Sequence, residues 1–149
     1  PTTPEILSST VPKSGLMTAS LSAKLEWELT QLSTNDEKEF RESLGVIESG
    51  AERVIATCYA LLGLVSFFTF GPDEVRAWSV PLHISAQKAA GKIHSDIERG
   101  FIRAEVINFE DMVRCGGSVS KARKQGLVRL EGKTYPVKDG DLITFLFNV

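Results

Sequence analysis

The first third of the chain repeats apolar residues at helical spacing. Intervals of three and four residues place side chains on one face of an α-helix, and four leucines follow them: Leu21, Leu25, Leu29 and Leu32. A short apolar run at residues 16–21 precedes the helix and predicts a strand. The tripeptide Ser22-Ala23-Lys24 lies at the junction between the two.

Two capping boxes predict where two further helices begin. In a capping box the hydroxyl of a serine or threonine binds the third helical N–H, and a glutamate three residues later binds the amide of the cap. Thr34 with Glu37 and Ser49 with Glu52 have this spacing. We expect both helices to end at a glycine, at positions 45 and 63.

From Leu64 onward the pattern becomes that of β-strands. Residues 65–70 are aromatic or β-branched, Gly71-Pro72-Asp73 is a turn sequence, and residues 75–80 form a second β-rich run. This arrangement predicts a hairpin. Alternation of apolar and charged residues at 102–106 predicts a further half-buried strand.

The rest of the second half contains short helical and extended segments. We expect helical turns at 85–91, 95–100 and 109–114, and extended segments at 135–137 and 143–149. Two strands, a helix and then further strands is the order of a β-grasp, a mixed sheet that half-surrounds one helix. The predicted class is therefore α+β.

Charge changes sign along the chain. Residues 1–63 carry nine acids and five bases, whereas residues 114–138 carry seven bases and one acid, Glu131. A basic segment without an accompanying apolar face suits a polyanion better than a membrane. The alternative is an ordinary solvated face. The seven bases are Arg114, Lys121, Arg123, Lys124, Arg129, Lys133 and Lys138.

Catalytic and metal-binding motifs are not found in the sequence. A phosphate-binding loop needs Gly-x-x-x-x-Gly-Lys-Ser/Thr, and the nearest imitation, residues 116–121, is predicted to be an ordinary loop. His94, Ser95 and Asp96 are consecutive and so do not converge on one reacting atom; Ser95 is expected to cap a helix instead. His83 has no second ligand at metal-binding spacing.

Two distant cysteines, Cys58 and Cys115, form neither a disulfide framework nor a metal pair. Reduced thiols and a cytoplasmic location are expected from this usage. Trp78 and seven phenylalanines are expected mostly in the core, with base stacking as the alternative. Trp78 and Phe145 in particular are predicted to be buried.

Three stretches closely resemble the C-terminal signature of the YchF (Obg-like ATPase) family of P-loop NTPases: residues 67–78, 89–106 and 138–149. The resemblance implies a TGS domain, a ubiquitin-like β-grasp, over residues 64–149. It implies that residues 1–63 are a linker and the mostly helical C-terminal remnant of the nucleotide-binding G domain. Residues 21–26 resemble the last nucleotide-binding motif of that domain, so Ser22, Ala23 and Lys24 are expected to contact a purine base.

By the same resemblance, the chain is a regulatory and binding module of a ribosome-associated ATPase or GTPase. The parent protein would bind ATP (or GTP) with Mg, whereas this chain, without a phosphate loop, is expected to bind no cofactor and to catalyse nothing alone. Expected partners are the ribosome or RNA and the missing nucleotide domain, and no membrane. The RNA contact is expected at Arg114, Lys121, Arg123, Lys124, Arg129 and Lys133. The alternative is a free-standing RNA-binding or adaptor domain that has no nucleotide domain.

Overall fold

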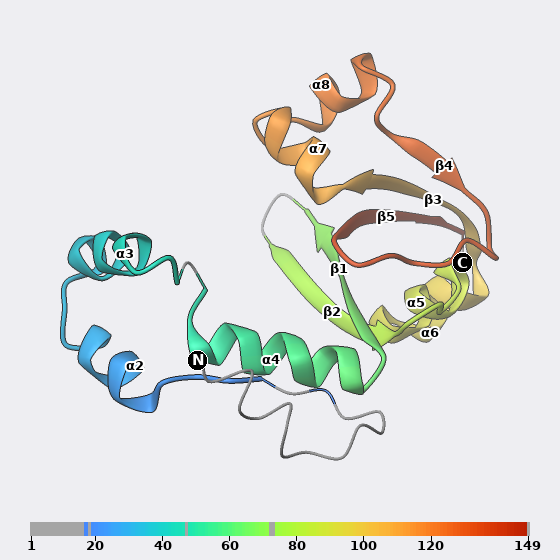
Figure 1. Cartoon of the computed structure of the whole chain (residues 1–149). Coiled ribbons are helices and arrows are strands. Elements are labelled where there is room, and N and C mark those ends of the chain that lie inside the picture. Colours follow the sequence, from blue (N-terminus) through green and yellow to red (C-terminus); the bar gives the residue numbers. More distant parts are fainter. Residues whose placement is uncertain (1–16, 18, 47, 72–73, 149) are drawn as a thin grey trace. The chain divides into compact units, whose positions relative to one another are not determined.

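The computed structural model describes residues 17, 19–46, 48–71 and 74–148 (Figure 1). The chain divides into two compact units, Pro1–Leu62 and Gly63–Val149. We call them the helical unit and the sheet unit and describe each by itself.

The helical unit contains α2 (Ala23–Leu29), α3 (Thr34–Ser43) and α4 (Gly50–Leu61). The capping box of Ser49 and Glu52 is confirmed, with both reciprocal hydrogen bonds present. The box predicted at Thr34 is wrong by one residue. Ser33 caps α3 instead, accepting from the amide of Asp36 while its hydroxyl donates to the Asp36 carboxylate at 2.6 Å.

The first helix is shorter than its leucine stripe predicts. α2 ends at Leu29, which is 1% exposed, and Leu32 lies beyond the helix and is 41% exposed. Residues 17 and 19–21 have no regular structure, and residues 16 and 18 lie outside the described residues, so no strand is found at the described positions.

The sheet unit is built on five strands: β1 (Leu64–Phe70), β2 (Val75–Pro81), β3 (Phe101–Asn108), β4 (Arg129–Glu131) and β5 (Asp141–Phe147). Their order across the sheet is β2-β1-β5-β3-β4. β1 and β5 are parallel, and the other neighbouring pairs are antiparallel. The predicted hairpin of β1 and β2 is confirmed, as is the α+β class.

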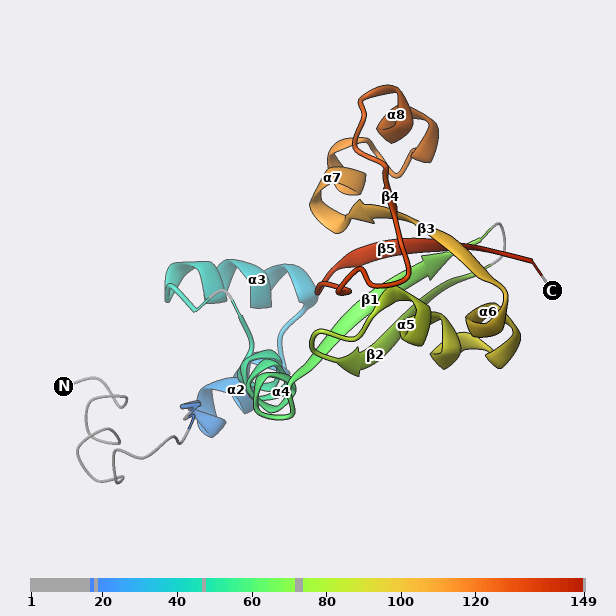
Figure 2. The same ribbon diagram turned by 90° about the vertical axis from the view of Figure 1, so that its right-hand side faces the viewer.

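Helices lie on both faces of this sheet (Figure 2). α5 (Ala86–Ile93) and α6 (Ser95–Arg99) cover one face; α7 (Phe109–Arg114) and α8 (Val119–Lys124) pack against the other. The predicted loop at 116–121 is wrong in its second half, because only Gly116 and Gly117 turn the backbone, with positive φ angles of 64° and 73°, before α8 begins.

The two helix-bearing faces have separate apolar cores. Phe67, Val80, Ala89, Val106 and Ile143 belong to the core under α5 and α6, which is the larger. Met112, Ala122 and Leu142 belong to a second core under α7 and α8. Trp78 and Phe145 are partly buried and pack against the first core, so the prediction that both are buried in the core is confirmed only in part.

Two strand predictions also need correction. A register shift between Phe101 and Arg103 turns Ile102 outward, where it is 53% exposed. Residues 135–137 form no strand, only an isolated bridge between Ser85 and Pro136.

Candidate functional site

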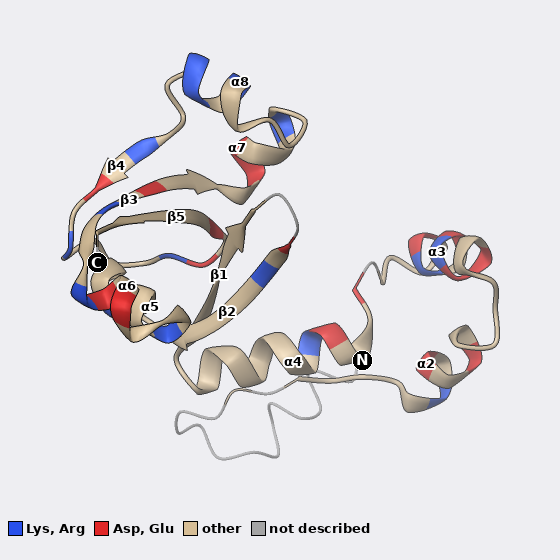
Figure 3. Cartoon of the chain, turned by 180° about the vertical axis from the view of Figure 1, so that it is seen from behind, with Lys and Arg blue, Asp and Glu red and all other residues tan. Residues whose placement is uncertain are grey.

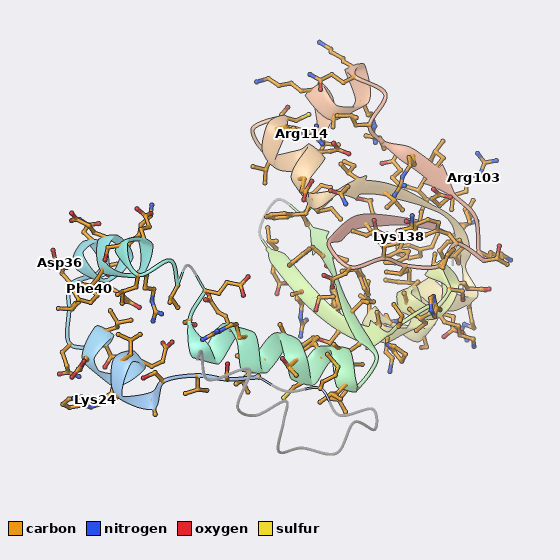
Figure 4. The ribbon with its side chains drawn as sticks, in the orientation of Figure 1. Lys24, Asp36, Phe40, Arg103, Arg114 and Lys138 are labelled. Atoms are coloured by element: carbon orange, nitrogen blue, oxygen red, sulfur yellow. The ribbon has the colours of Figure 1, made fainter. Side chains whose placement is uncertain are left out.

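The tripeptide Ser22-Ala23-Lys24 forms the exposed start of α2. The Ser22 hydroxyl accepts a hydrogen bond from the amide of Leu25 at 3.4 Å and so caps the helix. Lys24 is exposed on α2 (Figure 4), with its ammonium 3.8 Å from Glu28. All three residues are exposed. The segment therefore lies at the surface of the described part of the helical unit.

A nearly buried ion pair lies directly behind this segment. The Glu26 carboxylate accepts from Arg41 Nη2 at 2.8 Å and from the amide of Gly50 at 2.8 Å. Arg41 Nε also donates to Glu37 at 2.9 Å. The hydrogen bond from Arg41, followed by that from Gly50, holds the pKa of Glu26 below its usual range against the opposing effect of burial. The Glu26 carboxylate therefore joins all three helices through its contacts with Arg41 and Gly50.

Each arginine of the basic segment lies close to an acid, on the same helix for Arg114 and on another element for Arg123 and Arg129. Arg114 lies 2.5 Å from Asp111. Arg123 donates to both oxygens of Glu105, at 2.6 and 2.8 Å. Both side chains are exposed, 72% for Arg114 and 58% for Arg123, but each already has a carboxylate partner, which weakens its attraction for phosphate.

Arg129 belongs to a buried network that holds the loop before β5. The Asp141 carboxylate, in a side chain only 1% exposed, accepts from the Tyr135 hydroxyl and from the amide of Lys138, each at 2.9 Å. Arg129 Nη2 donates to the Tyr135 hydroxyl at 3.1 Å. Burial first, and then the hydrogen bond to Asp141, raise the pKa of Tyr135 to about 12. The role of Arg129 is thus largely structural.

The lysines of the segment remain free. Within the described part of the chain, none of their ammonium groups forms an ion pair, and all four are exposed: Lys121, Lys124, Lys133 and Lys138. Figure 3 shows the positive charge on α8 and on β4. The structure therefore divides the predicted contact residues into free lysines and neutralised arginines.

The other candidate groups have structural roles. His94, and not Ser95, caps α6 through its Nδ1, which accepts from the amide of Asp96 at 3.2 Å. His83 occupies a left-handed turn, with a φ of 66°. Among the described residues, no group of three potential metal ligands is found.

Two of the aromatic residues considered for base stacking are fully enclosed in the sheet unit, and others are exposed. Phe67 and Phe101 are buried, whereas Phe109 is 51% exposed and its ring lies 6.0 Å from that of Phe68. An apolar cavity of about 240 Å³ adjoins this pair. The described helices include none long and apolar enough to span a membrane.

Sequence reasoning missed Glu26, Arg41 and Asp141. Each acts through partners distant in sequence, as in the contact of Glu26 with Gly50, 24 residues later. An isolated acid or base on a helix gives no local signal for such a contact. For Asp141, the apolar run that follows it was a local hint of its burial.

Comparison with known proteins places the chain in a family. The YchF-GTPase C-terminal family model, described as a protein of unknown function (DUF933), matches residues 64–148. The ribosome-binding ATPase YchF of Bacillus subtilis is 50% identical over 127 residues, which cover 85% of this chain and 34% of that protein. Its counterpart from Escherichia coli O157:H7 is 46% identical over 137 residues, 92% of this chain and 38% of that protein.

The fold agrees with these matches. The structure of the Schizosaccharomyces pombe YchF GTPase superposes with a TM-score of 0.74 at 29% identity, covering 96% of this chain and 38% of that one. The chain thus spans between a third and two-fifths of the length of these relatives. It belongs to the YchF-GTPase C-terminal family and carries the TGS-like C-terminal region of the YchF Obg-like ATPases.

Proposed function

We propose that this chain is the C-terminal regulatory and binding module of a cytoplasmic, ribosome-associated P-loop ATPase or GTPase, and that its sheet unit contacts RNA or the ribosome. The observation that carries this proposal is the set of free lysines on α8 and in the loop before β5. Unpaired exposed ammonium groups attract phosphates more strongly than paired ones. The names of the relatives, which are ribosome-binding ATPases, support the same partner.

The helical unit, in this proposal, is the end of the parent's nucleotide-binding domain, and the sheet unit is its TGS domain. The exposed segment of Ser22, Ala23 and Lys24 fits a contact with the purine base of ATP or GTP, because it lies at the surface of the described part of the helical unit. The phosphates and Mg would be held by the nucleotide domain. That domain would supply the hydrolysis.

A first prediction follows for the isolated chain. Phosphate contacts provide most of the affinity of nucleotide sites, and this sequence has no phosphate loop. Calorimetric titration with ATP and Mg is therefore expected to give a dissociation constant weaker than micromolar. A micromolar constant would reveal a phosphate site that the sequence motifs do not show.

A second prediction tests the RNA contact directly. Reversing Lys121 and Lys124 to glutamate should weaken binding to a mixed-sequence single-stranded RNA and to ribosomes. Each lysine that neutralises a phosphate releases counterions, so each one lost should flatten the plot of log affinity against log salt by about 0.7. Fluorescence anisotropy across a salt titration measures both effects together.

The matched control reverses Lys38 and Lys92, one exposed lysine in each unit. Because all four positions are exposed, either double variant should change stability by only about 0.5 kcal/mol per site. Equal loss of RNA affinity in the two double variants would mean that binding depends on net charge alone. Unchanged affinity in the Lys121 and Lys124 variant would identify the basic segment as an ordinary solvated face.

A further inference from the structure

The start of α4 touches both sides of the proposed purine contact segment. A Cβ atom added to Gly50 would lie 3.0 Å from the Cβ of Leu21 and 3.1 Å from Oε1 of Glu26. Leu21 immediately precedes Ser22, and Glu26 follows Lys24 by two residues. The segment is thus held between two residues that both rest on the first residue of α4.

Glu26 makes the stronger of these two contacts. Its carboxylate receives the Gly50 amide and the Arg41 guanidinium, and its side chain is only 19% exposed. A half-buried carboxylate with two charged or polar donors has few alternative positions, because leaving either donor unsatisfied is costly. Movement of the segment must therefore move Glu26, break its bonds, or move the start of α4.

α4 is also the covalent connection to the sheet unit. It ends at Leu61, and β1 begins at Leu64. The only residues between them are Leu62, which caps α4, and Gly63, with a φ of 60°. A change at the start of α4 therefore occurs in the helix that leads directly into the sheet.

We propose that Glu26 is a positioning residue that couples the Ser22–Lys24 segment to α4, so that the order of one depends on the order of the other. Its role toward a nucleotide rests on the proposed function, since that assigns the segment to a purine base. Coupling is reciprocal by thermodynamic necessity. A ligand that fixes the segment would stabilise the first turn of α4, and a partner that fixes α4 would favour the ligand.

The test uses amide hydrogen exchange in the whole 149-residue chain, with no nucleotide. Ser22→Ala removes the cap of α2 and should lower protection of the Leu25 amide about fivefold. If Glu26 couples the two sites, the same substitution should also lower protection of the Gly50 and Arg53 amides in α4. In a chain that also carries Glu26→Gln, Ser22→Ala should no longer affect α4.

The reverse perturbation keeps the test valid if Glu26→Gln unfolds the helical unit. Gly50→Ala crowds Leu21 and Glu26 from the side of α4, and it should lower protection of the Leu25 and Glu26 amides. The matched control is Glu28→Gln, an exposed carboxylate on the same helix that lies 3.8 Å from the ammonium of Lys24. This variant should leave the hydrogen-exchange protection of the α4 amides unchanged.

A pH profile distinguishes coupling that depends on the charge of Glu26 from coupling that depends only on the packing of its side chain. The groups that face Glu26 are Arg41 of α3 and Arg53 and Glu52 of α4, with Glu37 bound to Arg41. Because the pKa of Glu26 is lowered in the folded state, its contribution is present above the ordinary glutamate pKa and is lost as pH falls below it. The effect of Ser22→Ala on Gly50 protection should therefore disappear toward acid pH, and should be absent at every pH with Glu26→Gln.

Two results would overturn the proposal. One is that Ser22→Ala leaves the protection of the α4 amides unchanged. The other is that Ser22→Ala lowers this protection equally with and without Glu26→Gln. Neither depends on nucleotide binding. If Ser22→Ala, which loosens the backbone of the segment by removing the cap of α2, leaves the ATP affinity of the intact parent protein unchanged, the purine assignment fails while the coupling stands. The two failures are therefore distinguishable.

Discussion

Replacing Phe67 by alanine is expected to destabilise the sheet unit by about 3–5 kcal/mol. Phe67 is completely buried, and its ring meets that of Phe145 edge to face at 6.0 Å. The substitution removes apolar contacts and leaves a cavity in the middle of the larger core. This loss is comparable to the whole stability of many domains, so we expect the variant to be partly unfolded at room temperature.

Urea unfolding followed by Trp78 fluorescence measures the effect in the sheet unit alone. The second tryptophan, Trp27 of the helical unit, is 66% exposed and can be replaced by phenylalanine in all variants. Phe109→Ala is the control, because its side chain is 51% exposed and should cost about 1 kcal/mol or less. Similar midpoints for the Phe67 and Phe109 variants would contradict the assignment of the core.

Replacing Asp141 by alanine is expected to destabilise the same unit by about 3 kcal/mol. The buried carboxylate satisfies the Tyr135 hydroxyl and the Lys138 amide, and it lies 3.5 Å from Arg129 Nη2. Its removal leaves these donors without an acceptor in a poorly hydrated site. Asp141→Asn, which keeps an acceptor oxygen, should cost less.

The Tyr135 ring reports on this network directly. Its pKa of about 12 reflects burial first and Asp141 second. An NMR titration of the labelled ring should therefore show a lower pKa in Asp141→Asn, still above that of free tyrosine. In the parent chain, stability should fall as pH rises from about 10, because the unfolded state releases its tyrosine proton first. An unchanged Tyr135 pKa in the variant would show that Asp141 does not hold the ring.

Local signals were sufficient to predict most of the sheet unit. The β1–β2 hairpin has aromatic and β-branched strands on either side of the sequence Gly71-Pro72-Asp73, of which residues 72 and 73 lie outside the described residues, and all of these sequence features lie within about 20 neighbouring residues. Helix α8 was missed because it has only six residues, three of them basic, too few to show an apolar stripe. The cap of α3 was misplaced because Ser33 and Thr34 are both hydroxyl residues, and the choice depends on Asp36.

The candidate site was harder to predict than the fold. The basic segment is visible in the sequence as a run of charges, but its free and neutralised members could not be separated there, and its role as a contact surface stays a prediction. The partner of Arg123 is Glu105, 18 residues earlier on β3. Asp141, at the start of β5, comes close to Arg129 only once the loop between β4 and β5 has folded. Which charges remain available to a ligand is decided by such long-range pairs, and a sequence pattern does not contain them.

The central place of β5 governs when the sheet can assemble during protein synthesis. β5 lies between β1 and β3, but both of those strands precede it in the chain. Translation adds 5–20 residues per second, so on the order of ten seconds separates the end of β1 from the start of β5. Throughout that interval the nascent β1–β2 hairpin has one strand edge unpaired, and the core around Phe67 lacks Ile143 of β5. The sheet is therefore completed only when β5 is inserted between β1 and β3. The time before this insertion is the period in which the growing chain is at greatest risk of aggregation.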